Sequence, residues 1–363
     1  MAVSINTLQS QAIDNYGSKD AYNGLARYDG VVWFCGQAGV ISQEVGGQPD
    51  FRERLMFGGN TTIGFRGKAG TIPRTDDEGF TLVSVPQKLI SGRIIWNQQE
   101  ADQVRGNSAL AKSKIIDKTR QFSNTWPITI AEKFRQATPG ADDPYTILGA
   151  SGEGSAILLP QAPASQTAVT GGIARSETTT VGGETIRYWA NQYSGTSFDL
   201  TTAAGRSALL RNVYLPCVRG NASGWAPDFG LVGTVAWASL SANADTLRRG
   251  QLVNDKAVSY GFKNIMFEEA TLFMDKSTRF LNVSAGKIAF LNSKALKLKY
   301  LEGSGGVTKE MLDEENNLKS LPIFWSVKDL QDFDTLSRTW IGYCTMNLVP
   351  LSLQDHGLAD NCT

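Results

Sequence analysis

The chain has 363 residues, of which 41% are hydrophobic, and its 35 Lys and Arg residues balance 35 Asp and Glu residues. A chain of this length can bury a sizeable core and divide into roughly two or three subdomains. The zero formal charge argues against a free-standing nucleic-acid binder, which usually carries a basic excess for its phosphate contacts. It also removes long-range repulsion between identical copies of the chain.

Cysteine and histidine usage narrows the chemistry. The cysteines at positions 35, 217, 344 and 362 are far apart in sequence, so no zinc site is predicted and free thiols in a reducing cytoplasm are expected. The single histidine, His356, lies in the polar segment LQDHGLADNCT, for which we predict a solvated tail. No apolar run reaches transmembrane length. We therefore expect no cofactor, no metal, no catalytic residue and no membrane association.

Residues 1–55 predict an extended arm with one short helical piece, anchored by the apolar run Val31-Val32-Trp33-Phe34 through pairing or packing. Residues 56–98 predict a long β-hairpin, because Ile63 and Phe65 alternate with Gly64 and Arg66. Strands of about twelve residues reach roughly 40 Å, and an isolated ribbon of that kind is only marginally stable in water. A neighbouring subunit is the natural support, although an ordinary pair of core strands is the alternative.

The hairpin supplies the candidate intersubunit contacts. They are side chains that an extended ribbon would present to a neighbour, and they are Ile63, Phe65, Arg66, Lys68, Arg74, Asp76, Asp77 and Glu78.

Residues 107–137 give the strongest helical pattern, with Asn107-Ser108 as cap, an interruption at Trp126-Pro127 and an end at Thr138-Pro139-Gly140. Its basic residues at 112, 114, 118 and 120 predict a solvated helix face. The Gly-rich and Ser/Thr-rich stretch 149–183 predicts loops, bulges and extended connections.

The following segments predict further alternation of helix and strand. We expect a helix that ends at Gly220, a buried strand over 227–233, a second helix from Val235, and then several strands over 261–300. In the last of these, Leu296, Leu298 and Tyr300 should be buried, while Lys297 and Lys299 form a wet face. A closing strand contains Trp340-Ile341-Gly342 and the pair Asn347-Leu348.

The order of these features resembles that of the major capsid proteins of tailed bacteriophages. The resemblance covers about residues 55–350 and rests on the Pro227-Asp228 strand, the Gly261-Phe262 strand, the segment Phe290-Leu291-Asn292 before Lys297-Leu298-Lys299, and the Asn347-Leu348 pair. It implies an α+β fold with an N-terminal arm (1–55), an extended hairpin loop (56–98), a peripheral domain with a spine helix (99–195), an axial domain with return strands (196–330), and a C-terminal return to the peripheral domain (331–363).

The function that the resemblance implies is self-assembly. Hexamers and pentamers of the chain would form an icosahedral shell around double-stranded DNA, assembled in the host cytoplasm and retained in the virion. Expected partners are other copies of the chain, packaged DNA by weak interior contact, and scaffolding, portal and decoration proteins. Two alternatives stay open: a cellular nanocompartment shell of the same fold, and a β-rich hydrolase or carbohydrate-binding protein, which eight tryptophans and many glycines would suit.

Overall fold

The computed structural model describes residues 30–35, 40–44, 46, 48–56, 80–103, 107–149, 156–181, 184–218, 226–242, 264–275, 286–301, 324–332 and 337–363. In chain order the elements are α3 (Gly30–Cys35), β1 (Ile41–Glu44), β2 (Asp50–Met56), β3 (Phe80–Pro86), β4 (Lys88–Trp96), α4 (Gln98–Gln103), α5 (Ser108–Arg135), β5 (Thr146–Leu148), β6 (Ala156–Leu158), a 3-10 helix (Pro163–Ser165), β7 (Val169–Thr170), β8 (Ile173–Ala174), β9 (Thr178–Val181), β10 (Glu184–Arg187), β11 (Gln192–Ser194), α6 (Ala203–Leu209), a π-helix (Leu210–Tyr214), α7 (Leu215–Cys217), β12 (Phe229–Val232), α8 (Thr234–Ala242), β13 (Asn264–Phe267), β14 (Ala270–Met274), β15 (Ile288–Leu291), β16 (Leu296–Leu301), β17 (Phe324–Asp332), β18 (Ser337–Pro350) and β19 (Gly357–Ala359).

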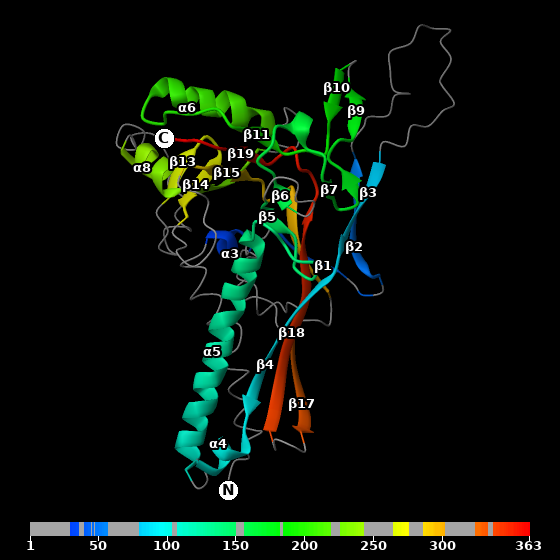
Figure 1. Ribbon diagram of the computed structural model, residues 1–363, viewed down its shortest axis with the longest axis vertical. Coiled ribbons are helices and arrows are strands. Elements are labelled where there is room, and N and C mark those ends of the chain that lie inside the picture. The colour runs from blue at the N-terminus through cyan, green and yellow to red at the C-terminus, as the bar shows by residue number, and fades with distance from the viewer. Residues whose placement is uncertain are drawn as a thin grey trace, which may run out of the picture.

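The longest strand, β18, organises one end of the molecule. It pairs antiparallel with β4 over residues 338–346, with β17 over residues 337–343, and with β16 over residues 346–350. Strand β1 then adds to β16 in parallel and completes a five-stranded sheet. Figure 1 shows this sheet and helix α5 running side by side along the long axis of the molecule.

Helix α5 begins at the predicted cap, where the Leu110 N–H donates to Asn107 Oδ1 at 3.1 Å. Its 28 residues span about 42 Å. Where the helix crosses the sheet, the Phe122 ring occupies the space above Gly92, because a Cβ atom at that glycine would lie 2.6 Å from Phe122 Cε2. A glycine in β4 thus sets how closely helix and sheet approach.

The predicted interruption at Trp126-Pro127 is wrong, because α5 is continuous from Ser108 to Arg135. A proline inside a helix cannot donate its backbone bond and costs about 3 kcal/mol. On either side of it, however, Trp126, Ile130 and Phe134 are buried in the main core. Since each such side chain contributes about 1.5–3 kcal/mol on burial, packing outweighs the local preference.

A six-stranded sheet, in the order β11-β19-β15-β12-β14-β13, forms the other end of the molecule. Its central strand β12 is buried at every position, as predicted for 227–233. Helices α6 and α8 lie beside this sheet in Figure 1, and a second core containing Leu209, Trp237 and Phe290 fills the space between them.

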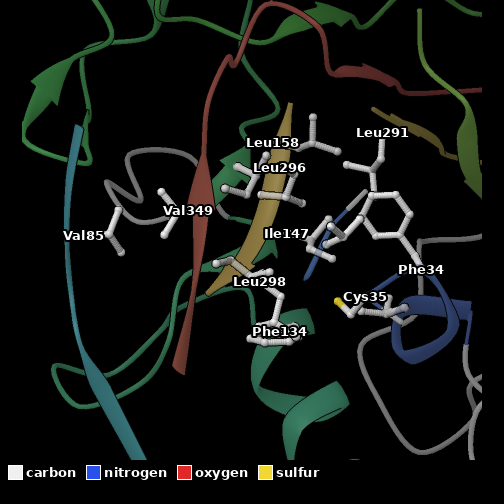
Figure 2. Packing of buried hydrophobic residues seen from close by; sticks show 14 of the residues in the cluster. Phe34, Cys35, Val85, Phe134, Ile147, Leu158, Leu291, Leu296, Leu298 and Val349 are labelled. Carbon is white, nitrogen blue, oxygen red and sulfur yellow. The ribbon is translucent and has the colours of Figure 1, made fainter. Parts of the chain in front are cut away.

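The two ends are joined through α3 and through an ion pair. In α3, the predicted anchor packs: Phe34 is buried with its ring centroid 4.6 Å from that of Phe229 in β12. Figure 2 shows Cys35, Phe134 of α5 and Leu298 of β16 converging in the same core. Arg135, at the end of α5, forms an ion pair with Asp275, and their side chains are 1% and 2% exposed. The long helix is therefore fixed to the six-stranded sheet by both apolar and charged contacts.

The segment between these ends is more ordered than its loop-like composition predicts. Residues 156–181 and 184–191 fold around Arg175, which is fully buried and donates to the side chains of Thr170, Gln166 and Asn191 at 2.8–3.0 Å and to two carbonyl groups. Burial lowers its pKa to about 9, so the guanidinium stays charged at neutral pH. A buried cation that exhausts its donors on neutral acceptors fixes the loops around it.

The prediction of a solvated tail around His356 is also wrong. Strand β19 lies inside the six-stranded sheet, parallel to β11 and antiparallel to β15. His356 is fully buried, and its carbonyl oxygen accepts from the Gln192 N–H at 2.9 Å. Polar residues are tolerated here because the strand pairing satisfies their backbone groups. The division of the chain into five domain segments stays a prediction.

Candidate intersubunit surface

The eight predicted contact residues, from Ile63 to Glu78, lie outside the described residues, so their role stays a prediction. The structure does describe the base of the predicted hairpin. Strands β2 and β3 pair antiparallel from Asp50 opposite Pro86 to Met56 opposite Phe80. We call residues 50–56 and 80–86 the hairpin root. In Figure 1 it projects from the body of the molecule beside β9 and β10.

The hairpin root has two different faces. On one face Phe51, Val83 and Val85 are buried, and Figure 2 shows Val85 pointing toward Val349 of β18. On the other face Phe80 is 61% exposed and Leu82 is 46% exposed. Residues directly opposite in a ladder share a face, so Arg54, which is paired with Leu82 and is exposed, belongs to this outer face, as does Arg52. An exposed apolar strip with a basic partner row is typical of an interaction surface.

Polar links fasten β3 to the body. Asn347 Nδ2 donates to the Pro86 carbonyl oxygen at 2.7 Å, while its Oδ1 accepts from the Tyr145 N–H at 2.8 Å. Further along β3, the Ser84 N–H donates to the Gly171 carbonyl oxygen at 2.9 Å. Gly171 has a φ of +61°, and a Cβ atom there would lie 2.6 Å from Val83 Cγ1. These hydrogen bonds therefore hold the inner face of the hairpin root against the body of the molecule.

Strand β2 is held by Lys299, which corrects the prediction of a wet lysine face on β16. The Lys299 ammonium lies 2.6 Å from Glu44 Oε2 of β1, 3.0 Å from Glu53 Oε1 of β2 and 3.0 Å from the Arg52 carbonyl oxygen. Its side chain is only 5% exposed. Lys297, one step earlier on the same face, is 31% exposed and 3.5 Å from Glu53. The predicted alternation of leucine and lysine faces in β16 is correct, but β1 and β2 cover the lysine face at Lys299.

The long helix carries basic residues of two kinds. Lys118 pairs with Glu100 at 2.5 Å and lies over the Trp96 ring, and Lys114 donates to Gln103. Burial would raise the pKa of Glu100, but the hydrogen bond and charge of Lys118 outweigh it and lower that pKa. Lys114 and Lys118 thus have partners within the subunit, and the side chains of Lys112 and Arg120 are exposed.

A pocket of about 220 Å³ lies between β4 and the C-terminal half of α5. Its walls include Ile90, Phe134 and Met346, and the ion pair between Lys133 and Asp143 (2.7 Å) lies beside them. Leu89, which is 62% exposed, stands at this pocket. The outer part of β4 is thus a second place where apolar groups face outward.

The four cysteines and the single histidine are buried. All four cysteines are free, as predicted, and all are buried. Burial raises the pKa of Cys217, and it raises the pKa of Cys344 and of Cys362 to about 12. Burial lowers the pKa of His356 to about 3. In the part of the chain that the structure describes, no three His, Cys, Asp or Glu side chains are grouped to hold a metal ion, and none of its helices is long and apolar enough to cross a membrane.

Comparison with known proteins identifies the fold. Neither a scan against protein-family models nor a search of curated proteins finds a match. Among solved structures, the capsid of cyanophage A-1(L) matches with a TM-score of 0.55 and 16% identity over 93% of both chains. The capsid of Myoviridae phage XM1 covers 89% of this chain and 90% of its own, with a TM-score of 0.47 and 11% identity. The capsid of an empty GTA particle covers 91% and 90%, with a TM-score of 0.48 and 9% identity.

The likeness to the cyanophage capsid subunit spans almost the whole chain, so the chain has the α+β fold of the tailed-phage major capsid proteins, as the sequence predicted. In this fold the outer face of the hairpin root is the strongest candidate for contact between subunits.

Proposed function

We propose that this chain is the major capsid protein of a tailed phage, and that its copies assemble as hexamers and pentamers into an icosahedral shell around double-stranded DNA. The observation that carries the proposal is the likeness to the cyanophage A-1(L) capsid subunit over 93% of both chains. The exposed strip of Phe80 and Leu82 supports it, because a projecting ribbon with an uncovered apolar face is stabilised by a neighbour.

The mechanism is a repeated heterologous contact. The outer face of one hairpin meets a different patch on the next copy, and the rotation between copies closes into rings. The interior contact with DNA would fall to the exposed Lys112, since Lys114 and Lys118 are engaged within the subunit. Scaffolding, portal and decoration proteins complete the set of proposed partners, and the proposed location is the virion after assembly in the host cytoplasm.

The nanocompartment alternative is not favoured, since the solved structure that carries the comparison is a phage capsid. The two shells differ in their contents, so nucleic acid that resists nuclease inside purified particles would favour the capsid, and an enclosed enzyme would favour the nanocompartment. The α+β capsid fold gives no support to a β-rich hydrolase or carbohydrate-binding protein.

The test is to shorten the hairpin. Replacing Gly64–Glu78 with a short Gly-Ser turn should leave a folded, soluble subunit that cannot close a shell, because loop closure depends only weakly on length while a contact is lost at every subunit boundary. Thermal unfolding reports the fold, and electron microscopy reports the particle. A Gly-Ser segment of the original length is the matched control, since it keeps the reach of the loop and removes its side chains.

Each outcome has a definite reading. Should the shortened protein unfold, the hairpin belongs to the core of its own subunit. Should it still form normal shells, the hairpin is not the intersubunit contact. A wild-type chain that sediments as a stable monomer at all concentrations would overturn the proposed function itself.

A further inference from the structure

We infer that Lys299 is a positioning residue that sets the direction in which the hairpin leaves the subunit, and that it couples this direction to the attachment of the N-terminal strand β1. The consequence for particle shape rests on the proposed function. The geometry on which the inference depends does not, because it lies within one subunit.

The first argument is the way the ammonium group is satisfied. The Lys299 ammonium donates to Glu44 Oε2 at 2.6 Å and to the Arg52 carbonyl oxygen at 3.0 Å, and it forms an ion pair with Glu53 Oε1 at 3.0 Å. One of these oxygen atoms belongs to β1 and two belong to β2. The side chain is 5% exposed, so a displaced β2 would leave a buried cation with unused donors, which is costly.

The second argument is that Lys299 joins β16 to two strands, β1 and β2, that precede it by about 250 residues in the sequence. Lys299 belongs to β16, which pairs with β1 through the register Ser42 opposite Lys299. Strand β2 belongs to a separate two-stranded sheet, so the angle between the hairpin root and the five-stranded sheet is not fixed by a ladder. The links from Asn347 and Gly171 reach β3 and its end. Lys299 adds a polar contact on β2, where Phe51 is already buried in the core, and contacts on both strands define a direction.

The third argument concerns what such a contact does in an assembly. Buried ion pairs contribute little net stability but can select one arrangement over another. In a ring built from one repeated heterologous contact, a small change of angle per copy decides whether and at what size the ring closes. A looser hairpin direction should therefore broaden particle geometry more than it lowers subunit stability.

The test compares three variants. Glu53→Gln removes the carboxylate on the hairpin and leaves Lys299 paired with Glu44. Lys299→Met removes all three contacts. Lys297→Met is the matched control, because this neighbour on the same face is partly exposed and, among the described residues, its ion pair is with Glu53 alone. The hairpin direction is measured in disassembled subunits by electron–electron distance spectroscopy between spin labels on Arg54→Cys and Ser113→Cys, two exposed positions, in protein diluted with unlabelled chains. The four native cysteines are buried and should not take the label.

We expect a single narrow distance distribution in the wild type and in Lys297→Met, and a broadened one in Glu53→Gln and Lys299→Met. Unlabelled shells of the latter two should lose their single diameter in electron microscopy. Folded Glu53→Gln and Lys299→Met proteins with the wild-type distance distribution would overturn the inference. If Lys299→Met fails to fold, Glu53→Gln decides. A wild type that forms no shells would refute the proposed function, while the distance distributions would still decide the role of Lys299.

Discussion

The hairpin root and the C-terminal segment make opposite use of their sequences. The strand FTLVSVP of the root is mostly apolar, yet Phe80 and Leu82 are 61% and 46% exposed. The segment DHGLADNCT at 355–363 is mostly polar, yet His356, Leu358 and Cys362 are buried. The difference lies in pairing partners: β3 has β2 on one side and projects from the body, whereas β19 lies between β11 and β15.

The contrast indicates that exposed apolar side chains and buried polar segments have different roles, one in contact with other copies and the other in the fold of the subunit. A polar segment can be buried when its backbone pairs with neighbouring strands of a sheet, so its side chains contribute to the stability of the subunit itself. An apolar strand that remains outside is available to another copy, so its side chains should serve assembly. The following variants separate these two roles.

The largest effect should come from deleting residues 357–363. The deletion removes β19 from between β11 and β15 and also removes the hydrogen bond from the Thr363 N–H to the Phe198 carbonyl oxygen. We expect loss of cooperative thermal unfolding and of solubility, measured by circular dichroism and sedimentation. A truncated chain with the thermal unfolding of the wild type would show that the segment is dispensable for folding, and would contradict the role in stability assigned to it.

A matched pair of leucines should give the next largest effect. Leu358→Ala removes a core side chain that is 2% exposed and should cost about 2–5 kcal/mol of unfolding free energy. Leu82→Ala changes an exposed side chain and should stay within about 0.5 kcal/mol, while reducing the yield of shells. Denaturant unfolding of disassembled subunits measures the first quantity, and sedimentation measures the second. Equal losses of stability in the two variants would contradict the assignment of faces.

His356 should add a pH dependence to the stability of the C-terminal segment. Its pKa is about 3 in the folded chain against an ordinary 6.5, so the unfolded chain binds the proton first as the pH falls. Stability is therefore complete above pH 6.5 and declines from there toward pH 3, by up to about 1.4 kcal/mol per pH unit.

The matched variant is His356→Gln, which keeps a polar side chain and cannot take up the proton. Its unfolding free energy should depend less steeply on pH than that of the wild type in mildly acidic buffer. Urea denaturation at several pH values gives the two slopes, and identical slopes would mean that His356 is not buried in its neutral form.

The smallest energetic effect is expected from the thiols. All four are free and buried, so alkylation without reductant should label none in the folded protein and all four after unfolding. Intact mass spectrometry counts the labels. An internal disulfide, or rapid labelling of Cys362 in folded protein, would contradict the burial of the C-terminal segment.

The features that the sequence predicts correctly are those that depend on neighbouring residues in the chain. The start of α5 at Asn107 and the buried strand after Pro227 depend on neighbours within a few residues, and both were predicted correctly. Lys299 was misread because the alternation of Leu and Lys is the same whether the lysine face is wet or covered. The covering residue Glu44 is 255 positions away, and no local pattern carries that information.

The candidate surface shows the same limit. The run from Phe80 to Val85 predicts a strand, but both of its faces carry apolar side chains, so the sequence cannot decide which face is exposed. The structure decides it through Gly171 and Val349, which occupy the inner side. The break predicted at Pro127 was wrong because proline has a low helix propensity, but core packing of the neighbouring side chains outweighs it. That packing is visible only in the tertiary structure.

Strand β18 has a mechanical consequence. Its 14 residues extend for about 48 Å, and three partner strands flank it along that length. The hydrogen bonds of an antiparallel ladder are perpendicular to the strands, so tension along β18 loads them in shear, many at once, and does not unzip them one by one. A chain built on such a strand is suited to carry tension from one end to the other, as the wall of the proposed shell would require under pressure from within.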